Sequence, residues 1–172
     1  KAEAAETAAD AAETAAKAAE SKADEAEPRI PIAGGTDAYT ISSGGSYYLA
    51  NNMYRTLTIS ADNVTLDLMG YTISPSSGDG INIPGDQKNI IVRNGIIRGA
   101  STGIDARYLR DSNSRFEELT VTDSSFCGMY IGSDCVVRDC LLIDNDDYGI
   151  QSSSDGKLEV RDCRIAATTG DG

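Results

Sequence analysis

The sequence of 172 residues contains no histidine, no tryptophan and only two phenylalanines. The absence of histidine excludes the Ser-His-Asp triad, the Cys-His pair and every zinc site with a histidine ligand. Aromatic residues make up only 6% of the chain, which disfavours a core built around large rings. No apolar run approaches the roughly 20 residues that a membrane-spanning helix needs. The first residue is Lys1 rather than Met, so we expect that an N-terminal segment, with any targeting signal, has been removed.

Positive charge is also scarce, because 15 basic residues face 27 acidic ones and the formal net charge is -12. Such a chain repels phosphate backbones and anionic lipids, so neither nucleic acids nor membrane surfaces are expected partners. The four cysteines include no Cys-x-x-Cys pair, which excludes a zinc ribbon and a thioredoxin-like motif. We expect no cofactor.

The first 27 residues differ in composition from the rest of the chain. They hold 13 alanines and no glycine, proline or aromatic residue, so they strongly favour one long α-helix. Eight of the alanines follow a heptad spacing that predicts a left-handed coiled coil; this seam consists of Ala2, Ala5, Ala9, Ala12, Ala16, Ala19, Ala23 and Ala26. The segment, with its string Lys22-Ala23-Asp24-Glu25-Ala26, resembles the alanine-zipper coils of bacterial murein lipoproteins. The alternative is a solvated linker helix.

Three segments follow from this composition. Residues 1–27 are interpreted as an oligomerisation helix, residues 28–56 as a connector and N-terminal cap, and residues 57–172 as a solenoid. Tyr47, Tyr48 and Tyr54 lie in the second segment, where we expect them to cover the first turn. Stacking of these rings on a sugar is the alternative.

Four columns of residues recur every 21 to 26 positions in the third segment. Glycine forms one column, and each of its first four members precedes an apolar residue of the core; the glycines are Gly80, Gly103, Gly128, Gly149 and Gly172, and the apolar residues are Ile81, Ile104, Met129 and Ile150, with Leu57 one turn earlier. Two further columns are apolar, and they consist of Leu66, Val92, Phe116, Val137 and Val160, and of Ile73, Ile97, Val121, Leu142 and Ile165. The last column is polar, and it consists of Asn63, Asn89, Asn113, Asp134 and Lys157.

Each turn therefore contains three short strands separated by polar or glycine-containing corners. Inward apolar residues that stack on their equivalents in the next turn build a core that no single turn could form. The repeat predicts an all-β solenoid, a right-handed parallel β-helix of about five turns, preceded by the Ala-rich α-helix.

Two strings are typical of one known group, namely Asn63-Val-Thr-Leu-Asp-Leu-Met-Gly-Tyr-Thr-Ile73 and Asn89-Ile-Ile-Val-Arg-Asn-Gly-Ile-Ile97. Over residues 28–172 the chain resembles the secreted bacterial right-handed β-helix repeat proteins of the pectate-lyase-like fold. The resemblance implies the fold and a location outside the cell or at its surface. It does not imply an activity, because this fold is used by lyases, polygalacturonases, phage tailspikes and inert surface fibres.

The sequence predicts no catalytic residue. The turns are uniform in length, so no insertion can wall a substrate cleft, and the charged outward row recurs in every turn. In that row, Asp67, Arg93, Glu117, Arg138 and Arg161 are expected to neutralise one another as a ladder. The polygalacturonase signatures, one of which needs histidine, are missing.

One dense acidic stretch suggests an alternative use. Asp144, Asp146 and Asp147 could supply oxygen ligands to Ca²⁺. However, Asp and Asn are also ordinary residues of tight corners, and that interpretation is favoured here, with no metal.

The cysteines leave two alternatives open. Cys140 and Cys163 end the matched strings Arg138-Asp139-Cys140 and Arg161-Asp162-Cys163, so they are expected in one inward column. A spacing of about 4.8 Å between turns permits a disulfide, but packed free thiols are favoured. Cys127 and Cys135 have no evident partner.

These features favour a non-catalytic structural subunit of an extracellular or cell-surface fibre or spike. We expect a homo-oligomer, a trimer or a filament, that assembles through the N-terminal helix and the open solenoid ends. Gly172 has no capping segment after it, so another chain is expected to cover that end. The alternative function is a carbohydrate-binding module, or a polysaccharide lyase or hydrolase of the β-helix class.

Overall fold

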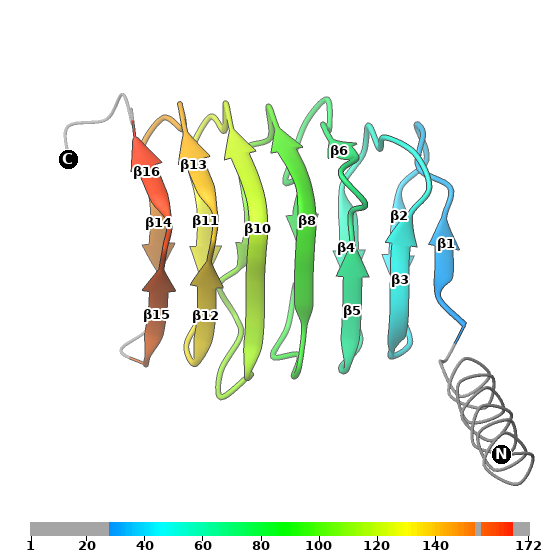
Figure 1. Ribbon diagram of the computed structural model, residues 1–172, viewed down its shortest axis with the longest axis horizontal. Coiled ribbons are helices and arrows are strands. Elements are labelled where there is room, and N and C mark those ends of the chain that lie inside the picture. Colours follow the sequence, from blue (N-terminus) through cyan, green and yellow to red (C-terminus); the bar gives the residue numbers. More distant parts are fainter. Residues whose placement is uncertain (1–27, 154–155, 167–172) are drawn as a thin grey trace, which may run out of the picture.

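The computed structural model describes residues 28–153 and 156–166. The alanine seam and Gly172 lie outside the described residues. The described chain winds into a solenoid of 16 short strands, and their pairings are parallel. Successive turns lie side by side along the long axis, from β1 at one end to β15 and β16 at the other (Figure 1).

The strands form three columns, which we call faces A, B and C. Face A consists of β1 (Ile30–Ile32), β3 (Gly45–Leu49), β5 (Val64–Asp67), the first parts of β8 (Ile91–Arg98) and β10 (Ser114–Thr122), β12 (Cys135–Arg138) and β15 (Leu158–Arg161). Face B consists of β6 (Thr72–Ile73), the second parts of β8 and β10, β13 (Leu141–Ile143) and β16 (Arg164–Ala166). Face C consists of β2 (Tyr39–Ile41), β4 (Leu57–Ile59), β7 (Ile81–Asn82), β9 (Thr102–Ala106), β11 (Cys127–Ile131) and β14 (Tyr148–Ser152).

The predicted apolar columns stack in register and form the core. On face A, Leu66 pairs with Val92, Val92 with Phe116, and Phe116 with Val137, and all four are fully buried. The other two columns pair in the same way on faces C and B; their members are Leu57, Ile81, Ile104, Met129 and Ile150, and Ile73, Ile97, Val121, Leu142 and Ile165. The predicted right-handed parallel β-helix of about five turns is confirmed for the described residues.

The last described turn departs from the prediction that every column member is buried. Val160 keeps its register with Val137 but is 43% exposed, and Ile165 is 47% exposed. Each lies in the final described strand of its face, so no described strand covers its outer side. Stacking from one turn to the next, rather than the residue type, therefore determines burial here.

The N-terminal boundary of the solenoid also differs from the prediction. Residues 28–56 do not form a separate connector and cap, because β1, β2 and β3 pair in register with the strands that follow them. Tyr47 pairs with Leu66 and is buried in the core column of face A, and its hydroxyl donates a hydrogen bond to the Ser43 carbonyl oxygen at 2.9 Å. Tyr54 remains half exposed.

The glycine column is required by close packing between faces C and B. A Cβ atom on Gly103 would lie 2.3 Å from Val121 Cγ1 and 2.4 Å from the carbonyl oxygen of Gly128. Gly80 and Gly149 would meet the next core side chains of face B, Ile97 and Ile165, at 2.4 and 2.3 Å. Only glycine lets the chain enter face C this close to the core.

The polar column marks a corner with left-handed backbone. Asn63, Asn89, Asn113 and Asp134 have φ angles of 56°, 55°, 49° and 55°, which Asn and Asp tolerate better than other residues with a side chain. The asparagines also form a ladder, in which Asn89 Nδ2 donates to Asn63 Oδ1 at 2.8 Å and Asn113 Nδ2 to Asn89 Oδ1 at 3.2 Å. The corner thus uses both the backbone and the side chain of each asparagine.

Candidate functional site

The charged row on face A forms ion pairs between neighbouring turns, as predicted. Asp67 Oδ2 lies 3.4 Å from Arg93, and Glu117 Oε2 lies 2.9 Å from Arg138. Both carboxylates are largely buried under these arginines. Arg161 instead pairs with Glu159 on its own strand. The row is a structural ladder, since its buried acids are already neutralised.

The acidic stretch after β13 forms a corner. Asp144 has a φ of 54°, and the backbone N–H groups of Asp146 and Asp147 donate to carbonyl oxygens of the preceding turn. Asn145 points inward and is fully buried; its Nδ2 donates to the Val121 carbonyl oxygen at 3.1 Å. No cluster of three or more acidic or cysteine side chains in the described residues could hold a metal ion, so the calcium alternative gains no support.

All four cysteines are free thiols. Cys127, Cys135 and Cys140 are buried, and Cys163 is half-buried. Burial raises the pKa of Cys127 to about 11 and that of Cys140 to about 12, so both remain protonated at neutral pH.

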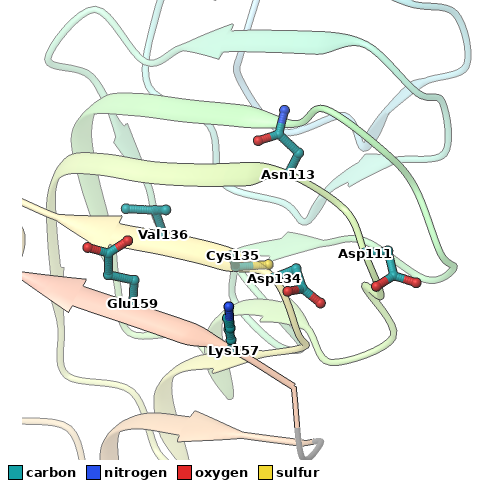
Figure 2. A pocket seen from close by; sticks show the side chains of 7 residues that line it. All are labelled: Asp111, Asn113, Asp134, Cys135, Val136, Lys157 and Glu159. Carbon is teal, nitrogen blue, oxygen red and sulfur yellow. The ribbon is translucent and has the colours of Figure 1, made fainter.

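A surface pocket of about 390 Å³ lies at the polar corners of face A (Figure 2). It is lined by Asp111, Asn113, Asp134, Cys135, Val136, Lys157 and Glu159. In the view of Figure 2 the Lys157 side chain lies between those of Glu159 and Asp134. The pocket thus continues the corner column, and its lining mixes both signs of charge.

A different group of side chains gathers on the outer surface of face C. Phe126 lies next to two tyrosines, with ring centroids 6.5 Å from Tyr130 and 6.4 Å from Tyr148. We call these three residues the aromatic cluster. The guanidinium carbon of Arg107 lies 4.2 Å from the centroid of the Tyr130 ring, which is a cation–π contact. The cluster therefore joins rings and charge in neighbouring turns.

Arg107 also makes a bidentate contact with the carboxylate of Asp105. Its Nε donates to Asp105 Oδ1 at 2.8 Å, and its second terminal nitrogen lies 2.7 Å from Asp105 Oδ2. These hydrogen bonds are the main cause that raises the pKa of Arg107. Asp105 is largely buried beneath this contact, so the Asp105–Arg107 pair is a fixed bidentate unit.

Asp79 is a second carboxyl close to this pair. Its Oδ1 accepts a hydrogen bond from the backbone N–H of Thr102 at 3.2 Å. Partial burial and then the negative charge of Asp105 raise the pKa of Asp79, and the hydrogen bonds from Thr102 only partly oppose them. The site thus holds one carboxylate fixed by arginine and one carboxyl that protonates more readily than usual.

The outward row of face C does not repeat from turn to turn. Asn82, Asp105, Tyr130 and Gln151 pair in register along β7, β9, β11 and β14. Each lies two residues after a glycine of the predicted column, at a position where the sequence shows no repeated charge. A row that changes its residue type in every turn is the signal that could have revealed it.

A family model described as "Right handed beta helix region" matches residues 39–172. The chain belongs to this β-helix family. No curated protein and no solved structure matches the sequence of this β-helix chain. No helix long and apolar enough to cross a membrane occurs in the described part of the β-helix chain.

Proposed function

We propose that this β-helix chain is a non-catalytic protein of the cell surface or exterior that binds a neutral polysaccharide along face C. The observation that carries the proposal is the aromatic cluster beside the Asp105–Arg107 pair. These residues occur at one place along the solenoid, whereas the architectural residues recur in every turn. A single, non-repeated group of rings and polar side chains is what recognition of a ligand requires.

The chemistry of the cluster suits a sugar ring. Tyr148 is 48% exposed and offers a flat apolar surface to the C–H face of a pyranose. Gln151 lies in register with Tyr130, and its buried Oε1 accepts no hydrogen bond from the described residues. A buried acceptor of this kind needs a donor, which a sugar hydroxyl supplies.

The charge of the site favours a neutral sugar over a uronic acid. The whole chain carries a formal charge of -12, which repels anionic polymers. The guanidinium of Arg107 could bind the carboxylate of a uronic acid. However, its Nε and one terminal nitrogen already donate hydrogen bonds to the two carboxylate oxygens of Asp105. A neutral polymer avoids this repulsion and can donate hydroxyl hydrogens to the acids.

The same bidentate contact supports a role without catalysis. Hydrolysis by paired carboxyl groups needs one free carboxylate and one acid, and both oxygens of Asp105 are held by Arg107. Incubation with pectin, alginate or galactomannan should therefore release neither reducing ends nor unsaturated sugars. Release that is abolished by Asp79→Asn or by Asp144→Asn would show that the protein is an enzyme.

Affinity electrophoresis in gels that contain dextran, galactomannan or polygalacturonate tests the binding. Retardation is expected with a neutral polymer and not with polygalacturonate. Tyr148→Ala should weaken binding about tenfold, or about 1.4 kcal/mol. The matched control is Tyr54→Ala, because Tyr54 is 50% exposed but lies outside the aromatic cluster. Equal effects of both variants, or no retardation by any neutral polymer, would contradict the proposal.

Self-assembly into a fibre or spike is the second candidate function. It is favoured by the unbroken alanine seam of residues 1–27. Assembly and sugar binding are compatible, because several copies on one polymer multiply a weak affinity.

A further inference from the structure

We propose that Cys140 and Cys163 form a cross-turn disulfide when the protein meets a disulfide oxidant. The proposal concerns a covalent modification site in the last two described turns and does not depend on sugar binding. It rests on the register of two faces, on the orientation of the two thiols and on the isolation of the other cysteines.

The register places the two cysteines opposite each other. Before them, Arg138 of β12 pairs with Arg161 of β15, and after them, Leu141 of β13 pairs with Arg164 of β16. The backbone N–H of Arg164 donates to the carbonyl oxygen of Cys140 itself, at 2.9 Å. Strands β15 and β16 accordingly lie beside β12 and β13 (Figure 1). Neighbouring strands are about 4.8 Å apart, which is within the Cα separation of disulfides.

The two thiols also point in the same direction. Each donates to the carbonyl oxygen two residues earlier at 3.1 Å, Cys140 to Arg138 and Cys163 to Arg161. Each also reaches toward a carbonyl oxygen of the preceding turn, Cys140 to Phe116 at 3.6 Å and Cys163 to Val137 at 3.7 Å. The side chains therefore stand in equivalent positions, one turn apart, and the Cys163 thiol contributes to the raised pKa of Cys140.

The other two cysteines have different partners. Cys135 Sγ lies 3.3 Å from Ser112 Oγ, and it pairs in register with Ser114 and Leu158. Cys127 lies in face C, where its strand neighbours are Thr102 and Tyr148. Neither residue faces another cysteine across a strand pair, so oxidation within the described chain should be specific for Cys140 and Cys163.

The order of the steps follows from exposure. Cys163 is half-buried, whereas Cys140 is buried. The thiolate of Cys163 attacks oxidised glutathione, releases one reduced glutathione and forms a mixed disulfide. Cys140 then loses its proton and attacks Cys163 Sγ, which releases the second reduced glutathione. Two electrons and two protons pass from the cysteine pair to one molecule of oxidised glutathione.

The bond should strengthen the end of the described solenoid. Strands β15 and β16 each have a described strand on one side only, and their core residues Val160 and Ile165 are exposed. Edge elements of this kind open more readily than the central turns. A covalent link from Cys163 to Cys140 should slow amide hydrogen exchange in β15 and β16 and leave the exchange of β5 and β8 unchanged.

The experiment equilibrates the full-length chain with mixtures of reduced and oxidised glutathione, followed by alkylation and peptide mapping. The expected result is a loss of 2 Da and one intramolecular link between the Cys140 and Cys163 peptides, with Cys127 and Cys135 alkylated. Cys127→Ser should still form the link, whereas Cys163→Ser should form none. Because Cys163 is half-buried, this variant should keep the circular dichroism spectrum of the wild type even if Cys140→Ser does not fold.

Four results would overturn the proposal. Cys163 could remain a thiol, or a mixed disulfide with glutathione, under the most oxidising mixture while the fold is intact. The link could form to Cys127 or Cys135, or Cys163 could link two chains. A link that forms only after unfolding in urea would equally contradict the inferred register.

Discussion

Replacement of Gly103 by alanine tests the packing between faces C and B most directly. The new Cβ would lie 2.3 Å from Val121 Cγ1 and 2.4 Å from the Gly128 carbonyl oxygen. Carbon atoms in favourable contact are about 3.5–4.0 Å apart. Val121 could adjust its side chain, but the Gly128 oxygen belongs to the backbone of the next turn. Relief of the second contact therefore requires β9 and β11 to move apart.

The expected cost can be worked from these contacts. Overpacking a well-packed core costs about 1–3 kcal/mol, and an immovable backbone atom favours the upper part of that range. Alanine also restricts the unfolded chain, which offsets about 0.4–1 kcal/mol. We expect Gly103→Ala to lower the free energy of unfolding by about 2 kcal/mol, which is a large part of a typical 5–15 kcal/mol.

Urea unfolding followed by circular dichroism measures this change. Gly85→Ala is the matched control, because its Cβ would meet only the end of the flexible Gln87 side chain, with the nearest atom at 3.0 Å. The control should be within about 0.5 kcal/mol of the wild type. If Gly103→Ala is as stable as Gly85→Ala, the close approach of faces C and B is wrong.

Three further predictions follow from burial, pKa and the alanine seam. Val137→Asp should lower the free energy of unfolding by about 4 kcal/mol or more, whereas Val160→Asp, in the same column but 43% exposed, should cost far less; similar urea midpoints would contradict the stacked core. The pKa of Asp79 is raised above 3.8 in the folded protein, so folding favours the neutral carboxyl and the wild type loses stability as the pH rises through that raised value. Asp79→Asn should therefore match the wild type near pH 3 and exceed it at pH 7 in urea midpoint, and equal midpoints at pH 7 would refute this. Ala12→Gln with Ala16→Gln should block oligomerisation in analytical ultracentrifugation, because the larger side chains separate helices at the seam; an unchanged oligomer would mean that the helix is only a tether.

The fold could be predicted because the same pattern of apolar and glycine residues recurs in every turn of the solenoid. The apolar columns were found from spacing alone, and Val92 and Phe116 pair as the spacing requires. The exposure of Val160 could not be predicted, since it depends on whether another strand covers that residue. The start of the solenoid was also missed, because β1 and β3 carry Pro31 and Tyr47 where later turns carry the regular pattern.

The candidate site was harder to predict because it is the part that does not repeat. The row that contains Asp67 and Glu117 stands out in the sequence because its residues are charged. In the structure, ion pairs with arginines neutralise both carboxylates. Asp105 and Tyr130 lie in different turns, 25 positions apart, and only the register of β9 and β11 brings them side by side. A contact of this kind depends on which outward residue follows each glycine, and no periodicity search detects it.

The glycine column has a consequence for how the outer surface of face C can vary. Glycine fixes the path of the chain where each turn enters face C, while the residue two positions later lies in the outward row. The outward row consequently has one residue per turn, at a spacing of about 4.8 Å. Its members are Asn82, Asp105, Tyr130 and Gln151. Exchange of one of these residues would change the side-chain chemistry of face C at one turn, while the glycine that precedes it keeps the path of the chain.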